Sequence, residues 1–295
     1  MDSKERAILK TLLYAEIFDY PLKKQEIFNF LISDKKTDEE IILQKLSAGK
    51  TPFKSKKGYF FIKGKEGLVE LREKRGKASR EKLSIAKKII KKVNFIPSIK
   101  FVGISGALSM KNSQRKDDID IFVISEKKLI WTTRFFLIVV LSFLGVYRKR
   151  KNKNVSDKIC LNMIVDEKRM RFLTGDRNLY TAHEIAQLLP VIDKDDSYQK
   201  FVRENVWIKN YLPNAFDNKI NYLKKRSNIL DKFLIKFFKN FFLEEILKFI
   251  QLKYMKNHIT KEKIKEGFLG FHPFDYKTHI LNSYKRKLKE HGLDD

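Results

Sequence analysis

The sequence predicts an α+β protein in which a small mixed β-sheet lies between an N-terminal helical module and a C-terminal helical region. Three observations support this fold class. Apolar residues recur at three- and four-residue spacing near the N-terminus, short apolar runs typical of strands begin at residue 99, and the chain after residue 178 shows no strand alternation. With 295 residues, of which 43% are hydrophobic, the chain can bury a core and divide into domains.

The charge of the chain is large and unevenly distributed. Its net charge is +27; residues 1–40 carry 7 basic and 9 acidic side chains, whereas residues 41–100 carry 18 basic and 4 acidic ones. A biased composition that only aids solubility is one interpretation. The local excess favours the other, a polyanionic partner such as nucleic acid or nucleotide phosphate.

Cysteine content and hydrophobicity indicate the compartment. Because Cys160 is the single cysteine, an internal disulfide framework and a cysteine-based zinc site are excluded. The polar N-terminus shows no signal peptide, so we expect a cytoplasmic protein. The apolar segment Leu129–Tyr147 contains Arg134, Ser142 and Gly145, and we expect a buried or interfacial helix between two strands rather than a membrane span.

The first 65 residues predict three helices followed by a hairpin. The helices are expected at Lys4–Phe18, Lys23–Ile32 and Glu39–Leu46, and the hairpin at Pro52–Ile62. This order resembles a winged helix. The functional interpretation places the third helix in a major groove and the basic wing on phosphate, through Lys54, Lys56 and Lys57. The alternative is a module used for protein contacts or domain packing.

Residues 66–96 predict a long basic helix with a partly buried apolar stripe. It connects the N-terminal module to the central domain and exposes a row of lysines and arginines. One interpretation is a connector with a solvated face, and the other is a contact surface for a phosphate backbone.

The chemistry of the central domain is indicated by a strand, a turn and two aspartates. Ile99–Ile104 predicts a strand, Ser105-Gly106-Ala107 a turn into a helix, and Asp118-Ile119-Asp120 the beginning of the next strand. Alternate side chains of a strand share a face, so the two carboxylates project together and repel unless a cation bridges them. Magnesium accepts such hard oxygen ligands, and a glycine turn lets backbone N–H groups approach phosphate.

This arrangement, SGALSMKNSQRKDDIDIFVI in the present chain, resembles the DNA polymerase beta-like nucleotidyltransferase superfamily. The family has a small mixed sheet and transfers a nucleotidyl group from a nucleoside triphosphate to a hydroxyl or phosphate with magnesium. The resemblance implies that Asp118 and Asp120 are metal ligands. It also implies that the turn at Ser105, Gly106 and Ala107 contacts the triphosphate.

The chain departs from the family pattern at two places. Ala107 stands where the family has a serine, and Ser105 or Ser109 would compensate for the lost hydroxyl. The family also has a third carboxylate on a neighbouring strand, for which the candidate here is Lys158–Val165. Cys160, Asn162 and Ile164 are expected on one face of it, and Asn162 cannot serve as a base. Asp157 would serve if the register differs.

The region after residue 178 is expected to be helical throughout. In family members a helical domain closes over the base and ribose, which makes several side chains candidates for the substrate pocket, with burial in the core as the alternative. These are Tyr180, His183, Glu184, Asn205 and Trp207. An amphipathic helix is expected at Leu234–Tyr254, packed on neighbouring helices, with membrane-surface binding as the alternative.

The predicted fold class is therefore α+β: a small mixed β-sheet nucleotidyltransferase core (97–177) flanked by an N-terminal winged-helix-like module (1–65), a basic connector (66–96) and a C-terminal all-helical domain (178–295). The predicted function is magnesium-dependent transfer of a nucleoside monophosphate from a triphosphate to RNA, protein or a small molecule. The competing prediction is a degenerate nucleotide-binding or nucleic-acid-binding regulator.

Overall fold

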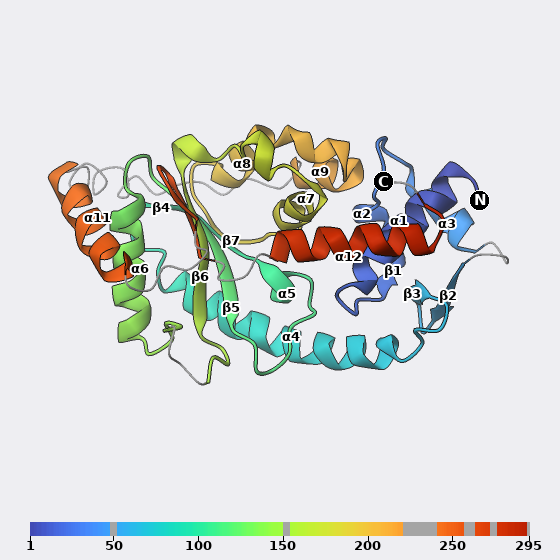
Figure 1. The fold of residues 1–295 in the computed structure, drawn as a ribbon. Helices are drawn as coiled ribbons and strands as arrows, with labels where there is room; N and C mark the ends of the chain where they lie inside the picture. The colour runs from blue at the N-terminus through green and yellow to red at the C-terminus, as the bar shows by residue number, and fades with distance from the viewer. Residues whose placement is uncertain (48–51, 150–153, 221–240, 257–262, 272–275, 294–295) are drawn as a thin grey trace.

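The structure is a computed structural model that describes residues 1–47, 52–149, 154–220, 241–256, 263–271 and 276–293. A six-stranded sheet occupies the centre, and the N-terminal module lies at one end of the molecule, joined to the sheet by the long helix α4 (Figure 1). Helices cover both faces of this sheet.

The N-terminal module has the predicted order of helices and hairpin, with one added two-residue strand. Asp2 and Glu5 form a capping box that starts the first helix, and Lys57 and Gly58, both at positive φ, form the hairpin turn. Its elements are α1 (Ser3–Glu16), β1 (Leu22–Lys23), α2 (Lys24–Asn29), α3 (Glu39–Leu46), β2 (Phe53–Lys56) and β3 (Tyr59–Ile62). Its identification as a winged helix stays a prediction.

The predicted basic helix forms as α4 (Leu68–Lys91) and is tied to both parts of the molecule. Near its beginning the Arg72 guanidinium is buried, bonds Glu26 at 3.0 Å and donates to the Lys111 carbonyl at 2.8 Å. Near its end Ala86 and Ile90 pack in the core of the central sheet. The helix therefore fixes the N-terminal module against the central domain.

The central sheet is mixed and has the strand order β7-β4-β5-β6-β9-β8. β5 pairs antiparallel with β4 and parallel with β6. The strands are β4 (Ile99–Ile104), β5 (Ile119–Ser125), β6 (Ile159–Asp166), β7 (Leu189–Asp193), β8 (Lys263–Lys265) and β9 (Phe268–Gly270).

The expectation of an all-helical region after residue 178 is wrong, because β7, β8 and β9 complete the sheet. β8 and β9 are only three residues long and joined by a turn at Gly267, so they are too short for alternation to reveal them. β7 contains Pro190, which stands near the edge of the sheet, where a missing N–H is tolerated. The predicted helix at Leu234–Tyr254 corresponds to α11 (Phe241–Lys256), and its first part lies outside the described residues.

The two faces of the sheet have different coverings (Figure 1). On one face Ile121 and Val123 pack with α4, α6 and α11, and on the other Phe122 and Ile124 pack with α7, α8 and the N-terminal module. The remaining elements are α5 (Gly106–Ser109), α6 (Ile130–Phe143), η1 (Glu167–Arg169), η2 (Thr174–Asp176), α7 (Leu179–Ala186), α8 (Ser197–Glu204), η3 (Val206–Asn210), α9 (Pro213–Ile220) and α12 (Tyr276–Glu290).

Helix α6 forms between β5 and β6 and covers the sheet, as predicted for the apolar segment. Within the part of the chain that the structure describes, no helix combines the length and apolar character that crossing a bilayer requires. The last helix, α12, returns to the N-terminal module, where Lys287 binds Glu16 at 2.9 Å. The N- and C-terminal segments are thus packed together.

Candidate active site

Two carboxylates meet at the beginning of β5. Asp118 immediately precedes the strand, and Asp120 is its second residue. One ligand atom from each of Asp118, Asp120 and Cys160 lies within 4.8 Å of the others. This separation is small enough for a single cation to bridge the atoms. Two of them are carboxylate oxygens, which hard cations such as magnesium prefer.

The glycine turn lies directly beside Asp120. Gly106 has a φ of +61°, and a Cβ atom there would lie 2.7 Å from Asp120 Oδ2, so both conformation and space require glycine. The Ser105 N–H donates to the Asp120 carbonyl at 3.0 Å, which fixes the start of the turn to the strand. The structure therefore brings the turn and the two carboxylates together.

Few hydroxyl groups around the turn are available to contact a ligand. Ala107 is exposed, and the hydroxyl of Ser109 is buried and donates to the Gly106 carbonyl at 2.8 Å. Because Ser109 Oγ stabilises its own helical turn, Ser105 is the better candidate for replacing the missing hydroxyl. The Ser105 hydroxyl accepts a hydrogen bond from Asn162 Nδ2 at 3.4 Å.

The charges of the aspartate pair are only partly compensated. Burial and the neighbouring Asp118 charge raise the pKa of Asp120 from 3.8 to about 7. Asp118 instead binds Arg148 Nη1 at 2.5 Å, and the same nitrogen lies 3.4 Å from Cys160 Sγ. A cation at the pair would therefore relieve a repulsion that the protein alone leaves in place.

The β6 residue next to the pair is Cys160, and a bulge follows it in the strand. Asp120 is in register with Cys160, but the pairing then jumps from Leu161 to Met163, so Asn162 has no partner on β5. Ile164 consequently packs on the opposite face, with α6 and α11, and the expectation that it shares a face with Asn162 is wrong. Cys160, rather than Asn162, is the closest β6 neighbour of the carboxylates.

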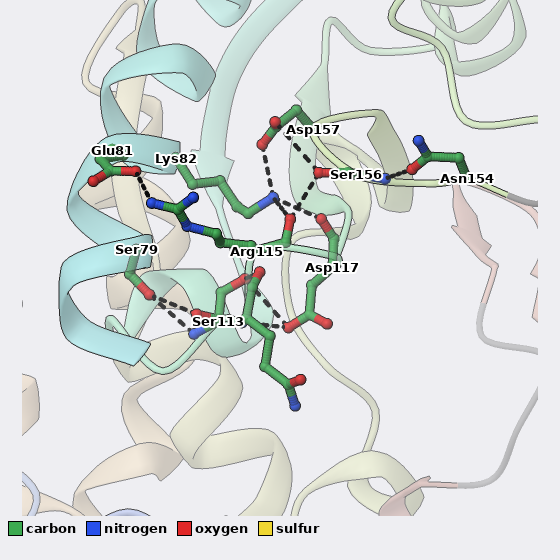
Figure 2. Close-up of polar contacts among 10 residues, drawn as sticks. Ser79, Glu81, Lys82, Ser113, Arg115, Asp117, Asn154, Ser156 and Asp157 are labelled. Carbon is green, nitrogen blue, oxygen red and sulfur yellow. Dashed lines mark hydrogen bonds and ion pairs between the residues drawn. The ribbon is translucent and has the colours of Figure 1, made fainter. Parts of the chain in front are cut away.

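Asp157 has a different partner (Figure 2). Its carboxylate binds the buried ammonium of Lys82 at 2.7 Å, and Lys82 also donates to the carbonyls of Arg115 and Asp117. The carboxylate of Asp117 accepts from the Gln114 N–H at 2.7 Å and closes the same loop. Asp157 therefore stabilises the loop before β5, and it does not belong to the Asp118 and Asp120 group.

A cavity of about 380 Å³ opens beside the site. Its walls are mainly aromatic and apolar, and they come from the sheet, from α7 and from the C-terminal strands and helix. They include Ser105, Phe122, Asn162 and Met163 from the sheet side, Tyr180, Thr181, Glu184 and Ile185 from α7, and Lys263, Phe268, Tyr276 and Lys277 from the C-terminal part. A space of this size and lining suits an organic ligand with few polar groups.

Only two of the five predicted pocket residues line this cavity, Tyr180 and Glu184. His183 is buried and stacks on Tyr14 with ring centroids 4.1 Å apart, and burial lowers its pKa to about 3. Asn205 is fully buried and accepts from Trp207 Nε1 at 3.0 Å. His183, Asn205 and Trp207 therefore belong to the core.

A second hollow, of about 490 Å³, adjoins the cavity and shares Phe172, Asp176 and Phe268 with it. Basic side chains dominate its lining: Lys168, Arg169, Arg171, Arg177 and Lys265. We call it the basic hollow. Asp176 is engaged by Lys263 at 2.9 Å and Glu266 by Arg169 at 3.6 Å, so an excess of positive charge faces the hollow.

The three lysines of the predicted basic wing belong to the hairpin, which lies at the beginning of α4 and away from the aspartate pair. Lys56 binds Glu70 at 2.7 Å, and Lys57 binds Glu73 at 3.1 Å, while Lys54 is exposed. Both ion pairs join the hairpin to α4. Nucleic-acid binding by Lys54, Lys56 and Lys57 stays a prediction, and phosphate would have to replace Glu70 and Glu73.

Three parts of the site escape sequence reasoning. The pairing of Cys160 with Asp120 depends on the register between β5 and β6, and Arg148 stands in a basic run whose charge suits many roles. The wall formed by Phe268 and Lys277 comes from residues far along the chain. No local signal in the sequence identifies the register or the cavity wall. Arg148 does have a usable signal, because it is an arginine close in sequence to the strands that carry the aspartates and their neighbour.

Comparisons of the chain with protein-family models, with curated proteins and with solved structures gave no match.

Proposed function

We propose that this protein is a magnesium-dependent nucleotidyltransferase. The observation that carries the proposal is the juxtaposition of Asp118, Asp120 and the Gly106 turn, in which two carboxylate oxygens converge and a glycine leaves room beside them. This is the arrangement that the sequence resemblance implies for binding a cation and a triphosphate.

The donor set fits magnesium at two of its three positions. Asp118 and Asp120 would hold the ion, and substrate phosphates and water would complete its coordination. The Cys160 thiol is not a ligand that magnesium favours, so we assign it no such role. Bound magnesium would supply positive charge that stabilises the charge developing on the transferred phosphate and on pyrophosphate.

The remaining residues position the substrate. The Gly106 turn offers backbone N–H groups to phosphate, and Arg148, which neutralises Asp118 in the absence of a ligand, is placed to attract the triphosphate. The acceptor then attacks the α-phosphorus in line with the leaving pyrophosphate. The cavity beside the turn encloses an organic part of the substrates.

The basic hollow favours a polyanionic acceptor among the classes that the sequence leaves open. It adjoins the cavity that Ser105 of the glycine turn helps to line, so a phosphate chain lying in the hollow can extend into that cavity. RNA satisfies this requirement better than a neutral small molecule does.

A second candidate is a nucleotide-binding regulator without transferase activity. It is favoured by the residues of β6, where Cys160 and Asn162 stand in place of a carboxylate. Such a protein would bind nucleic acid through its basic surfaces and use the nucleotide only as a signal.

One experiment separates these functions. The protein is incubated with α-labelled triphosphates, magnesium and either total RNA or total protein. Label transfer that disappears in Asp118→Ala and in Asp120→Ala, and persists in a control such as Glu204→Ala on the exposed side of α8, supports the enzyme. Salt-sensitive binding of duplex nucleic acid without any transfer supports the regulator and overturns the proposal.

A further inference from the structure

Near the aspartate pair β6 supplies no carboxylate to remove the proton of an acceptor hydroxyl, because its one acid, Asp166, ends the strand and accepts from the Lys128 and Lys168 N–H groups. Asn162 cannot accept a proton, and Asp157 is held by Lys82. Cys160 lies in the same group of ligand atoms as Asp118 and Asp120 and carries no carboxylate, so we assign it no part in the proton transfer. A nucleotidyltransferase with this site needs its base from another element.

Helix α7 brings one carboxyl group to the cavity. Asn178 caps the helix by accepting from the Thr181 N–H at 3.0 Å, which fixes its first turn. Tyr180 and Glu184, four residues apart, then lie on the side that lines the cavity. Ser105 and Asn162 line the same cavity from the sheet, so Glu184 shares a single space with the glycine turn.

The Glu184 carboxyl is half-buried and has no hydrogen-bonding or ionic partner among the described residues. The contrast with Asp176, another acid of the cavity wall, is clear, because Asp176 is bonded to Lys263 at 2.9 Å. An acid left without a partner in a largely apolar wall costs stability. A ligand that uses it is the simplest reason for its position.

We propose that Glu184 is the general base that accepts the proton of the acceptor hydroxyl. The inference rests on the nucleotidyl transfer proposed above. In this step the acceptor O–H proton passes to the Glu184 carboxylate, and the oxygen forms a bond to the α-phosphorus. The bond from the α-phosphorus to the bridging oxygen breaks, and pyrophosphate leaves with the electron pair.

The electrostatic surroundings suit this role at neutral pH. Burial, followed by the Asp120 charge, raises the pKa of Glu184 from 4.5 to about 7. The ionisable groups that face it are Asp120 on β5, Tyr180 on its own helix and Tyr14 on α1. A base with a pKa near the working pH combines availability with proton affinity.

The test uses the full-length protein with ATP, GTP, CTP or UTP, magnesium and water as the acceptor, and measures pyrophosphate release in a single turnover. Glu184→Gln keeps the shape of the side chain but cannot take a proton, Glu184→Asp keeps the carboxylate, and Glu204→Gln is the matched control on α8. Equilibrium binding of the magnesium–nucleotide complex and the unfolding temperature are measured for each variant.

We expect Glu184→Gln to slow release by about 100- to 10,000-fold while the nucleotide Kd changes by less than about threefold. The wild-type rate should rise with pH up to about 7, and this rise should be absent in Glu184→Gln. Glu184→Asp should recover part of the rate, and Glu204→Gln should behave as wild type.

Three results would overturn the inference. A Glu184→Gln rate within about threefold of wild type shows that no proton passes to this residue. An equal loss of rate and nucleotide affinity shows that Glu184 recognises the nucleotide instead. A wild-type protein that binds nucleotide but releases no pyrophosphate with water, with total RNA or with total protein as the acceptor contradicts the proposed function itself, and the base with it.

Discussion

Four acids of this molecule form two pairs with opposite surroundings. Asp157 binds Lys82 at 2.7 Å and Asp176 binds Lys263 at 2.9 Å, so each has a cation supplied by the protein. Among the described residues neither Asp120 nor Glu184 forms an ion pair, although Arg148 stands near Asp120, and burial raises the pKa of each to about 7. The two acids held by lysines maintain the fold, whereas Asp120 and Glu184, in the apolar surroundings of the site, are available to a ligand.

The largest effect that tests this difference is the loss of transfer on changing Asp120. We expect Asp120→Asn to lower the rate of nucleotidyl transfer by about a thousandfold or more, because a metal ligand is lost at the reacting phosphate. The metal-free protein should become more stable, since the repulsion with Asp118 disappears. Single-turnover transfer and thermal unfolding measure the two effects.

Asp157→Asn is the control for that experiment. If the two groups of acids differ as described, this variant keeps the transfer rate within a few-fold of wild type. A variant of Asp120 that keeps activity, or that loses stability as Asp157→Asn does, would show that Asp120 and Asp157 do not differ in role.

The pH dependence of metal binding gives the next largest effect. Since the pKa of Asp120 is raised to about 7, the carboxyl is protonated below that pH, and a metal must displace the proton. Manganese affinity should rise by about tenfold per pH unit up to about pH 7 and then level off. Titrations between pH 5 and 8, roughly the range around this pKa, measure it. A flat profile would contradict the shift.

Stability should show the opposite trend with pH. The native metal-free protein keeps a proton on Asp120 that the unfolded chain releases near pH 4, at about the ordinary carboxyl pKa. Stability therefore falls as the pH rises from about 4 to about 7, because the unfolded state binds fewer protons there. Denaturant unfolding at several pH values should show this fall in wild type, and a smaller one in Asp120→Asn.

A smaller effect, on the free energy of unfolding, is expected for the ion pair of Asp157 with Lys82. Asp157→Asn leaves the buried Lys82 ammonium with only carbonyl partners, and we expect a loss of about 1–3 kcal/mol in unfolding free energy, since Asp157 is itself partly exposed. Lys82→Met together with Asp157→Asn should recover part of it. Urea unfolding of the single and double variants measures the coupling, and additive losses would show that the pair is not coupled.

The smallest effect concerns the basic surfaces. We expect the double variant Arg171→Ala, Lys265→Ala in the basic hollow to weaken the salt dependence of single-stranded RNA binding. The slope of the logarithm of the binding constant against the logarithm of the salt concentration should fall in magnitude by about 1. Lys56→Ala with Lys57→Ala should change it less, because Glu70 and Glu73 already neutralise these lysines. Fluorescence anisotropy at several salt concentrations measures both. Equal slopes for the two double variants would contradict the difference between the surfaces.

The predictions that rested on local periodicity agree with the structure. The hairpin at Phe53–Ile62, helix α6 and the strand beginning at Ile119 each follow from apolar spacing and turn residues. The approach of Gly106 to Asp120 also follows from sequence, because a strand and a turn leave few alternatives. What the sequence supports is therefore the part of the site carried by one short segment.

The parts that sequence reasoning misses depend on pairing between distant segments. Cys160, and not Asn162, pairs with Asp120, and nothing in the residues before or after announces this register or the bulge at Asn162. The strands β8 and β9 form only because β6 offers an edge to pair with. His183 and Trp207 resemble pocket residues in type, yet packing against α1 and Asn205 places them in the core.

The binding of Mn²⁺ to the metal-free full-length protein tests the metal site at Asp118 and Asp120 most directly. The electron paramagnetic resonance signal of free Mn²⁺ reports how much of the ion is bound. We expect saturable binding that is lost in the double variant Asp118→Asn, Asp120→Asn and retained in Asp157→Asn. Binding that survives the double change at Asp118 and Asp120, or that disappears with Asp157, would contradict this expectation.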